Sequence, residues 1–206
     1  MELHAAGFVL VVLLAWTALA IALGARAERR IGSLPALPWT GAGACAVLAL
    51  AALATRAPAS ALGCGIACIA LLVASIGDAR TGYLFDAITF PAAVAVVAVA
   101  VADGETAAAA AGVVLLVGLF GGIVAVSRGR WMGLGDVKAM FALGAAFGPV
   151  ESIVAVFVAC VSGIAASAVG GRLSRGAEVR FGPHLAFGGA FALVAGDRIV
   201  HGWMGL

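Results

Sequence analysis

Long apolar runs, separated by short breaks that carry most of the polar residues, dominate this sequence. A helix needs about 20 apolar residues to cross the hydrocarbon core of a bilayer. The candidate spans are residues 3–24, 38–55, 61–77, 87–102, 107–127, 139–148, 150–169 and 183–200. The pattern predicts an all-α polytopic bundle of about eight transmembrane helices, forming a single domain over residues 1–206.

Composition supports a membrane protein and excludes one class of partner. Of the 206 residues, 64% are hydrophobic and 11% are charged, against roughly 25% charged residues in soluble domains. The net charge is only +2, and no basic run is interleaved with aromatic residues as a nucleic-acid surface would require. We therefore expect the chain to contact membrane lipid and no nucleic acid.

The four cysteines lie inside apolar runs, without a nearby histidine or a second closely spaced pair; they are Cys45, Cys64, Cys68 and Cys160. Residues in this setting are typical small buried side chains. The sequence predicts neither metal ligands nor disulfides here, and it predicts no cofactor.

Basic residues fall on alternate loops. Ten of the twelve lysines and arginines do so, and Arg56 and Arg198 are the two exceptions. The positive-inside rule makes these loops cytoplasmic. The predicted topology has both termini outside.

Residues 139–169 could form one long helix or a hairpin. A single crossing would place the basic residues around Arg172 opposite those around Arg128, against the charge rule. A turn at Gly148 and Pro149 keeps both groups inside, so we predict a hairpin. Its first arm is short, about 21 Å even if it begins at Leu134.

Two acidic residues stand at predicted cytoplasmic junctions between a span and a loop: Asp78 closes the third span, and Asp136 opens the sixth. Two carboxyl groups in a poorly solvated site cannot both ionise cheaply, so they tend to share one proton. Such a pair suits peptide hydrolysis, in which the ionised member takes a proton from water and the other hydrogen-bonds the carbonyl oxygen. The alternative is structural, with Asp136 capping its helix and Asp78 pairing with Arg80.

Glycines flank the second aspartate. Gly133 and Gly135 remove side chains beside Asp136, which would let an extended substrate backbone approach the carboxyl group. The G-x-G-D string is a weak signal alone, because glycine is abundant in this chain.

Three segments together resemble the type IV prepilin peptidases, which are intramembrane aspartic proteases of the G-x-G-D class. GLGDVKAMFALGAAFG, residues 133–148, resembles the signature around the second catalytic aspartate. DARTGYLFDAITFP, residues 78–91, matches the family pattern after the first aspartate, and RFGPHLAFGG, residues 180–189, resembles the segment that opens the last helix. The resemblance covers about residues 40–200.

The resemblance implies an aspartic endopeptidase of the bacterial inner membrane, with its active site facing the cytoplasm. Its substrate would be a prepilin or pseudopilin, from which it removes a short basic leader. Asp78 and Asp136 would be the catalytic residues, and Gly182 and Pro183 would help to shape the site.

The sequence departs from the family pattern at three places. Phe85 stands where the family usually has proline, and His184 replaces an apolar residue. Larger members carry an insert with two CxxC pairs between the first two spans, associated with N-methylation. Here that stretch is only RAERRIGSLPALP, so the chain resembles the compact form associated with tight-adherence (Flp-type) pili and is not expected to be a methyltransferase.

Lys138 lies two positions after Asp136 and, on a helix, about 200° away from it. We expect it to shape the site electrostatically, by attracting an acidic group of the substrate or a lipid headgroup, or to act only as a basic anchor on the inner side.

Two other functions remain open for the same residues. A transporter or proton-relay protein could use buried aspartates, and a pilus-assembly subunit could be catalytically inactive. No obvious inverted repeat relates the two halves of the chain, which weighs against a transporter.

Overall fold

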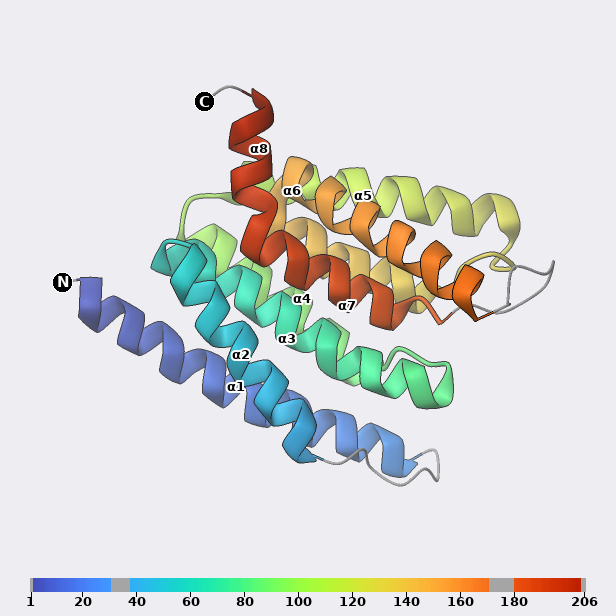
Figure 1. Ribbon diagram of the computed structural model, residues 1–206, viewed down its shortest axis with the longest axis horizontal. Helices are drawn as coiled ribbons and strands as arrows, with labels where there is room; N and C mark the ends of the chain where they lie inside the picture. Colours follow the sequence, from blue (N-terminus) through green and yellow to red (C-terminus); the bar gives the residue numbers. More distant parts are fainter. Residues whose placement is uncertain (1, 31–37, 171–179, 205–206) are drawn as a thin grey trace.

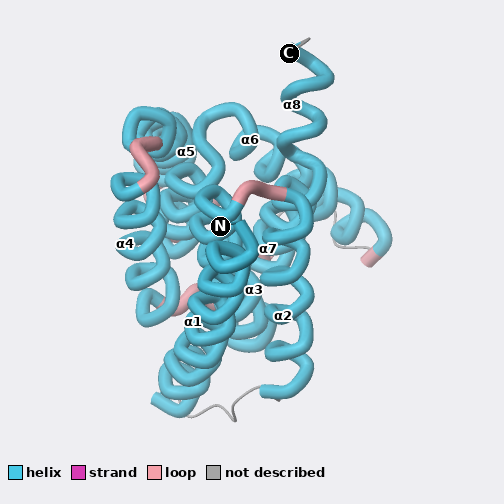
Figure 2. Tube along the Cα trace, turned by 90° about the vertical axis from the view of Figure 1, so that its left-hand side faces the viewer, coloured by secondary structure: helices cyan, strands magenta, loops and turns pink. Residues whose placement is uncertain are grey.

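The computed structural model describes residues 2–30, 38–170 and 180–204. Within these ranges the chain is helical and contains no strand, and the remaining described residues form short loops (Figure 2). The helices are α1 Glu2–Arg30, α2 Pro38–Thr55, α3 Pro58–Thr81, α4 Asp86–Ala102, α5 Thr106–Ser127, α6 Leu134–Val169, α7 Gly182–Phe191, the π-helical turn η1 Ala192–Gly196, and α8 Asp197–Met204.

The all-α fold is confirmed, but the expected count of about eight spans is not matched. In the described part of the chain, four helices are long and apolar enough to cross a membrane, and they are His4–Arg30, Ser60–Thr81, Thr106–Ser127 and Leu134–Val169. Gly43–Thr55 and Asp86–Ala102 are apolar but shorter. The count differs because these two helices are short, because the runs 139–148 and 150–169 are counted together as α6 although the chain bends between them, and because η1 divides the last run.

Helix α3 forms the centre of the bundle. It contacts α1, α2, α4, α6 and α7, and Figure 1 shows it enclosed by them. Its small side chains, including the buried Cys64 and Cys68, allow neighbouring backbones to approach closely. Cys45 is also buried and Cys160 is partly buried, so three of the four cysteines are the small core residues that the sequence predicts.

Helix α6 reverses direction at Gly148, whose backbone is non-helical with φ 65° and ψ −172° and is followed by Pro149. A side chain would be strained at this positive φ, so glycine suits the turn. A Cβ atom on Gly189 of α7 would meet Leu143, before the turn, whereas one on neighbouring Gly188 would meet Ala155, after it. Both arms of α6 therefore flank α7 (Figure 1), which confirms the predicted hairpin.

An ion pair joins three elements at the end of the bundle away from the last turn of α3. Arg56, between α2 and α3, donates to Glu151 of α6 and also to the carbonyls of Ala192, at 2.9 Å, and Leu193, at 3.2 Å. The π-helical turn leaves carbonyl groups outside the regular helical pattern, and the guanidinium satisfies two of them. This contact ties the C-terminal end of α7, through η1, to α6.

Candidate active site

The bundle brings Asp78 and Asp136 to one end. Asp78 lies in the last turn of α3 and is 5% exposed. Asp136 lies in the first turn of α6 and is half-buried. The two carboxyl groups interact electrostatically, and we call them the aspartate pair below.

The start of α7 surrounds the Asp78 carboxyl group. The backbone N–H of Gly182 donates to Asp78 Oδ2 at 2.9 Å. A Cβ atom on Gly182 would lie 2.7 Å from the same oxygen, so only glycine leaves room for this contact. Pro183 follows within the first turn, where its fixed φ suits a helix start and its missing N–H leaves no donor unpaired. The N-terminal end of α7 thus faces an acidic side chain, which the helix dipole favours.

The two glycines beside Asp136 lie in different surroundings. Gly133 is the N-cap of α6, and its backbone interacts with the Asp136 carboxyl group, in the manner of an acidic third residue that bonds back to the cap. A Cβ atom on Gly133 would lie 3.8 Å from Asp136 Oδ2, an ordinary contact. On Gly135, a Cβ atom would lie 3.1 Å from Leu84 Cβ. Gly135 therefore permits close packing against the loop before α4. The substrate access that we expect from both glycines stays a prediction.

Loop 82–85 joins the two segments that carry the aspartate pair. Leu84 packs on Gly135, and the ring of Phe85 packs on Gly77, where a Cβ atom would lie 2.6 Å from it. Phe85 has φ −77°, which proline could also adopt, so this departure from the family pattern keeps the backbone of the turn. The sequence did not point to Leu84, because nothing in its neighbours marks its partner 51 positions later.

Lys138 has a partner within the chain. Its Nζ lies 2.6 Å from Oδ2 of Asp86 in α4, and both side chains are exposed. The lysine thus links the start of α4 to the start of α6. Its orientation away from Asp136 follows the helical spacing, but the sequence analysis missed Asp86 as the acidic group that it contacts.

Arg80 does not pair with Asp78 through any salt bridge that the structure shows among its described residues. It instead lies 3.6 Å from the buried carboxylate of Glu28 in α1. His184 faces a different element, because its Nδ1 lies 3.1 Å from Ser162 Oγ in α6. Arg180, to which no pattern in the sequence gave a role, donates to the carbonyl of Ala79, directly after Asp78.

An apolar groove of about 470 Å³ lies along the first arm of α6. Val137 and Lys138, the two residues after Asp136, form part of its wall, and the groove continues between α4, α5 and the first arm of α6. Its other lining residues are Thr89, Phe90, Ala93, Val94, Val97, Val117 and Phe141. The groove gives an apolar segment a place to lie along α6, near the end of the helix that carries Asp136.

No group of three or more histidine, cysteine, aspartate or glutamate side chains gathers around a possible metal position in the described ranges. The chemistry that the residues at this end can supply is therefore that of two carboxyl groups, with backbone N–H donors around them.

A model of the type IV leader peptidase family matches residues 65–168. This range contains both members of the aspartate pair and about half of the chain. The chain belongs to the type IV leader peptidase family. No curated protein and no solved structure matches it.

Membership of the leader peptidase family makes the chain a protease that processes leader peptides, in a protein whose apolar helices place it in a membrane. The matched range ends before α7. Gly182, which donates to Asp78, thus comes from a part of this leader peptidase that the family match does not cover.

Proposed function

We propose that this leader peptidase removes the leader of a prepilin or pseudopilin at the cytoplasmic face of the bacterial inner membrane, with Asp78 and Asp136 as its catalytic pair. The observation that carries the proposal is the position of the two carboxyl groups at one end of the bundle, in the last turn of α3 and the first turn of α6, with the N–H of Gly182 donating to Asp78. Two carboxyl groups held together favour a state with one shared proton.

That state suits hydrolysis of a peptide bond. The ionised carboxylate takes a proton from water as the water oxygen bonds to the carbonyl carbon, and the protonated carboxyl group donates to the carbonyl oxygen. When the carbon–nitrogen bond breaks, the proton taken from water passes to the leaving amine.

The apolar groove supports a substrate that is partly embedded in the membrane. Its wall includes Val137 and Lys138, which follow Asp136 in the sequence, and apart from the lysine and Thr89 it is apolar. In the proposal, the apolar residues next to the scissile bond occupy this groove. The pair formed by Lys138 and Asp86 then marks its charged, interfacial end.

The orientation rests on the distribution of charge along the sequence. Asp78 and Asp136 adjoin two of the four loops that together carry ten of the twelve basic residues, and the positive-inside rule makes these loops cytoplasmic. A basic leader, which cannot easily cross the bilayer, would lie on this side.

Co-expression with a prepilin tests the proposal against the transporter and the inactive assembly subunit. The proposal predicts that the precursor shifts to the mobility of the mature pilin when the wild-type protein is present. An unshifted precursor, with both proteins found in the membrane fraction, would contradict it and favour one of the other two functions.

A further inference from the structure

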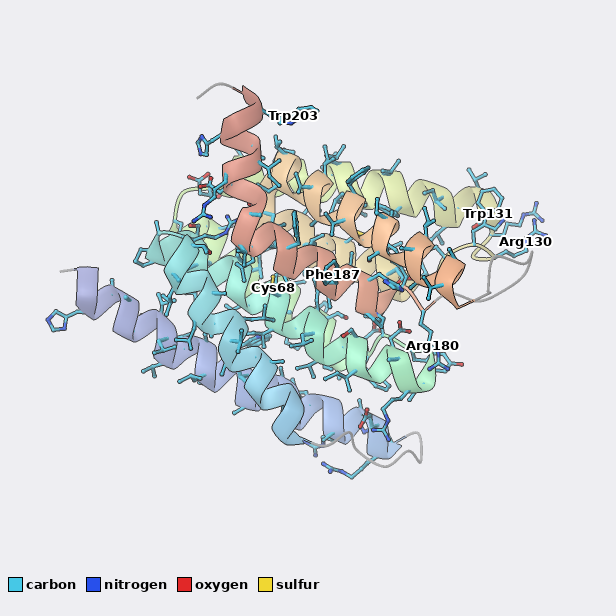
Figure 3. All side chains as sticks on the ribbon, viewed as in Figure 1. Cys68, Arg130, Trp131, Arg180, Phe187 and Trp203 are labelled. Atoms are coloured by element: carbon cyan, nitrogen blue, oxygen red, sulfur yellow. The ribbon has the colours of Figure 1, made fainter. Side chains whose placement is uncertain are left out.

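Arg180 lies next to the aspartate pair but outside every motif position to which a role has been given. Its guanidinium donates to the carbonyl oxygen of Ala79 and interacts electrostatically with Asp78. Figure 3 shows Arg180 between the start of α7 and the end of α3. The arginine thus joins two elements that meet at the buried carboxyl group.

The contact with Ala79 has a local physical cause. The last carbonyl groups of a helix lack partners within the helix, and Ala79 lies in the last turn of α3. A cation near a helix C-terminus is favoured by the helix dipole. The contact holds the guanidinium at the carbonyl of the residue that follows Asp78 in the sequence.

The two members of the aspartate pair differ in their surroundings. Asp78 is almost fully buried, accepts the N–H of Gly182, and lies within the field of Arg180. Asp136 is half-buried and interacts with the backbone of Gly133 and with Asp78. Donors and an opposite charge offset part of what a buried carboxylate loses when it leaves water, and Asp78 has the N–H of Gly182 and the charge of Arg180.

We propose that Arg180 is a positioning residue that holds Asp78 in its ionised form, so that Asp78 is the general base and Asp136 carries the shared proton. The inference rests on the proposed function, because it assigns roles within the catalytic pair. It gives each aspartate one task, since Asp78 takes the proton from water and Asp136 donates to the carbonyl oxygen of the substrate.

The other charged groups near Asp78 are already engaged. On its own helix, Arg80 pairs with Glu28 of α1. From α4, Asp86 pairs with Lys138 of α6. Apart from Asp136, the charge that acts on Asp78 in the described structure is that of Arg180.

The test measures kcat/KM against pH for leader cleavage by the full-length protein in nanodiscs, with the variants Arg180→Lys, Arg180→Gln and Arg180→Glu. The acidic limb of this profile reports deprotonation of the base. Because a positive neighbour favours the charged carboxylate, losing it moves the acidic limb to higher pH, by about 0.2 to 0.7 unit for an exposed arginine. The limb is expected to stay in place for lysine, to move for glutamine, and to move further for glutamate.

Arg130→Gln is the matched control. Arg130 is also exposed and also donates to a backbone carbonyl at a helix end, that of Ser127 in α5, at 3.2 Å. Figure 3 shows it away from Arg180, near the end of α5. This variant is expected to keep the wild-type profile.

Three results would overturn the inference. An acidic limb that stays in place in both Arg180→Gln and Arg180→Glu would show that the arginine does not stabilise the base. Movement of the alkaline limb alone would make Asp78 the acid, and a rise in KM alone would make Arg180 a substrate contact. If one of these two variants cannot be purified, the other decides. Failure of the proposed function is distinct, because the wild-type protein itself would then not cleave the leader.

Discussion

The contact between Gly182 and Asp78 predicts a large loss of activity from a single methyl group. In Gly182→Ala, the new Cβ atom would lie 2.7 Å from Asp78 Oδ2 and 3.0 Å from Asp78 Cβ. Both distances are well below the about 3.5 to 4.0 Å at which non-bonded carbon atoms attract each other. The carboxyl group must therefore move, and its 2.9 Å hydrogen bond from the Gly182 N–H is lost or weakened.

The size of the effect follows from that hydrogen bond. A hydrogen bond to a charged group contributes about 1.5 to 3 kcal/mol. Each 1.36 kcal/mol lost from the transition state costs a factor of ten in rate, so kcat/KM is expected to fall by about 10- to 150-fold. Alanine is a better helix former than glycine, so the unfolding temperature is expected to change little.

The assay follows leader release by the purified protein in nanodiscs, together with its thermal unfolding. Gly163→Ala is the control, since a Cβ atom there would meet the ring of His184 at an ordinary 3.5 Å. Activity of Gly182→Ala within twofold of wild type would refute the reasoning. A fall in activity matched by a collapse in unfolding temperature would also refute it, because the clash would then be structural.

Three further outcomes follow from the structure. In Gly144→Ala, a Cβ atom would lie 2.5 Å from a backbone oxygen of α5. Overpacking of this kind costs about 1 to 3 kcal/mol of stability, so the unfolding temperature should drop. The control Gly118→Ala, with open space around the new Cβ atom, should leave the unfolding temperature unchanged. Ala93→Phe should fill part of the groove and raise KM about threefold or more with kcat little changed, and Ala98→Phe, exposed on the same helix outside the groove, should not. In Glu105→Cys, a membrane-impermeant thiol reagent should label intact cells; labelling only after permeabilisation would invert the topology.

The sequence predicted the features that depend on local spacing. The helical class follows from long apolar runs, and the reversal at Gly148 follows from a glycine and proline pair combined with the charge rule. The positions of Asp78 and Asp136 at the ends of spans placed both at one end of the bundle once the topology was drawn. These inferences needed only the order of apolar and polar residues.

The remaining features depend on packing between distant segments. Lys138 contacts Asp86, 52 positions earlier, and Arg180 contacts a backbone carbonyl, which has no signature in a sequence. The span count was not matched for a related reason. The π-helical turn η1 interrupts the last apolar run at residues 192–196, and hydropathy does not encode such a change of backbone conformation.

The proposed catalytic pair is tested most directly by leader cleavage with purified Asp78→Asn and Asp136→Asn in proteoliposomes, with the products identified by mass spectrometry. An amide can neither take up nor supply the shared proton, so each variant is expected to be at least about 100-fold slower than the wild-type protein, at an unchanged unfolding temperature. Cleavage at the same bond within about tenfold of the wild-type rate, in either variant, would contradict a mechanism that uses both carboxyl groups.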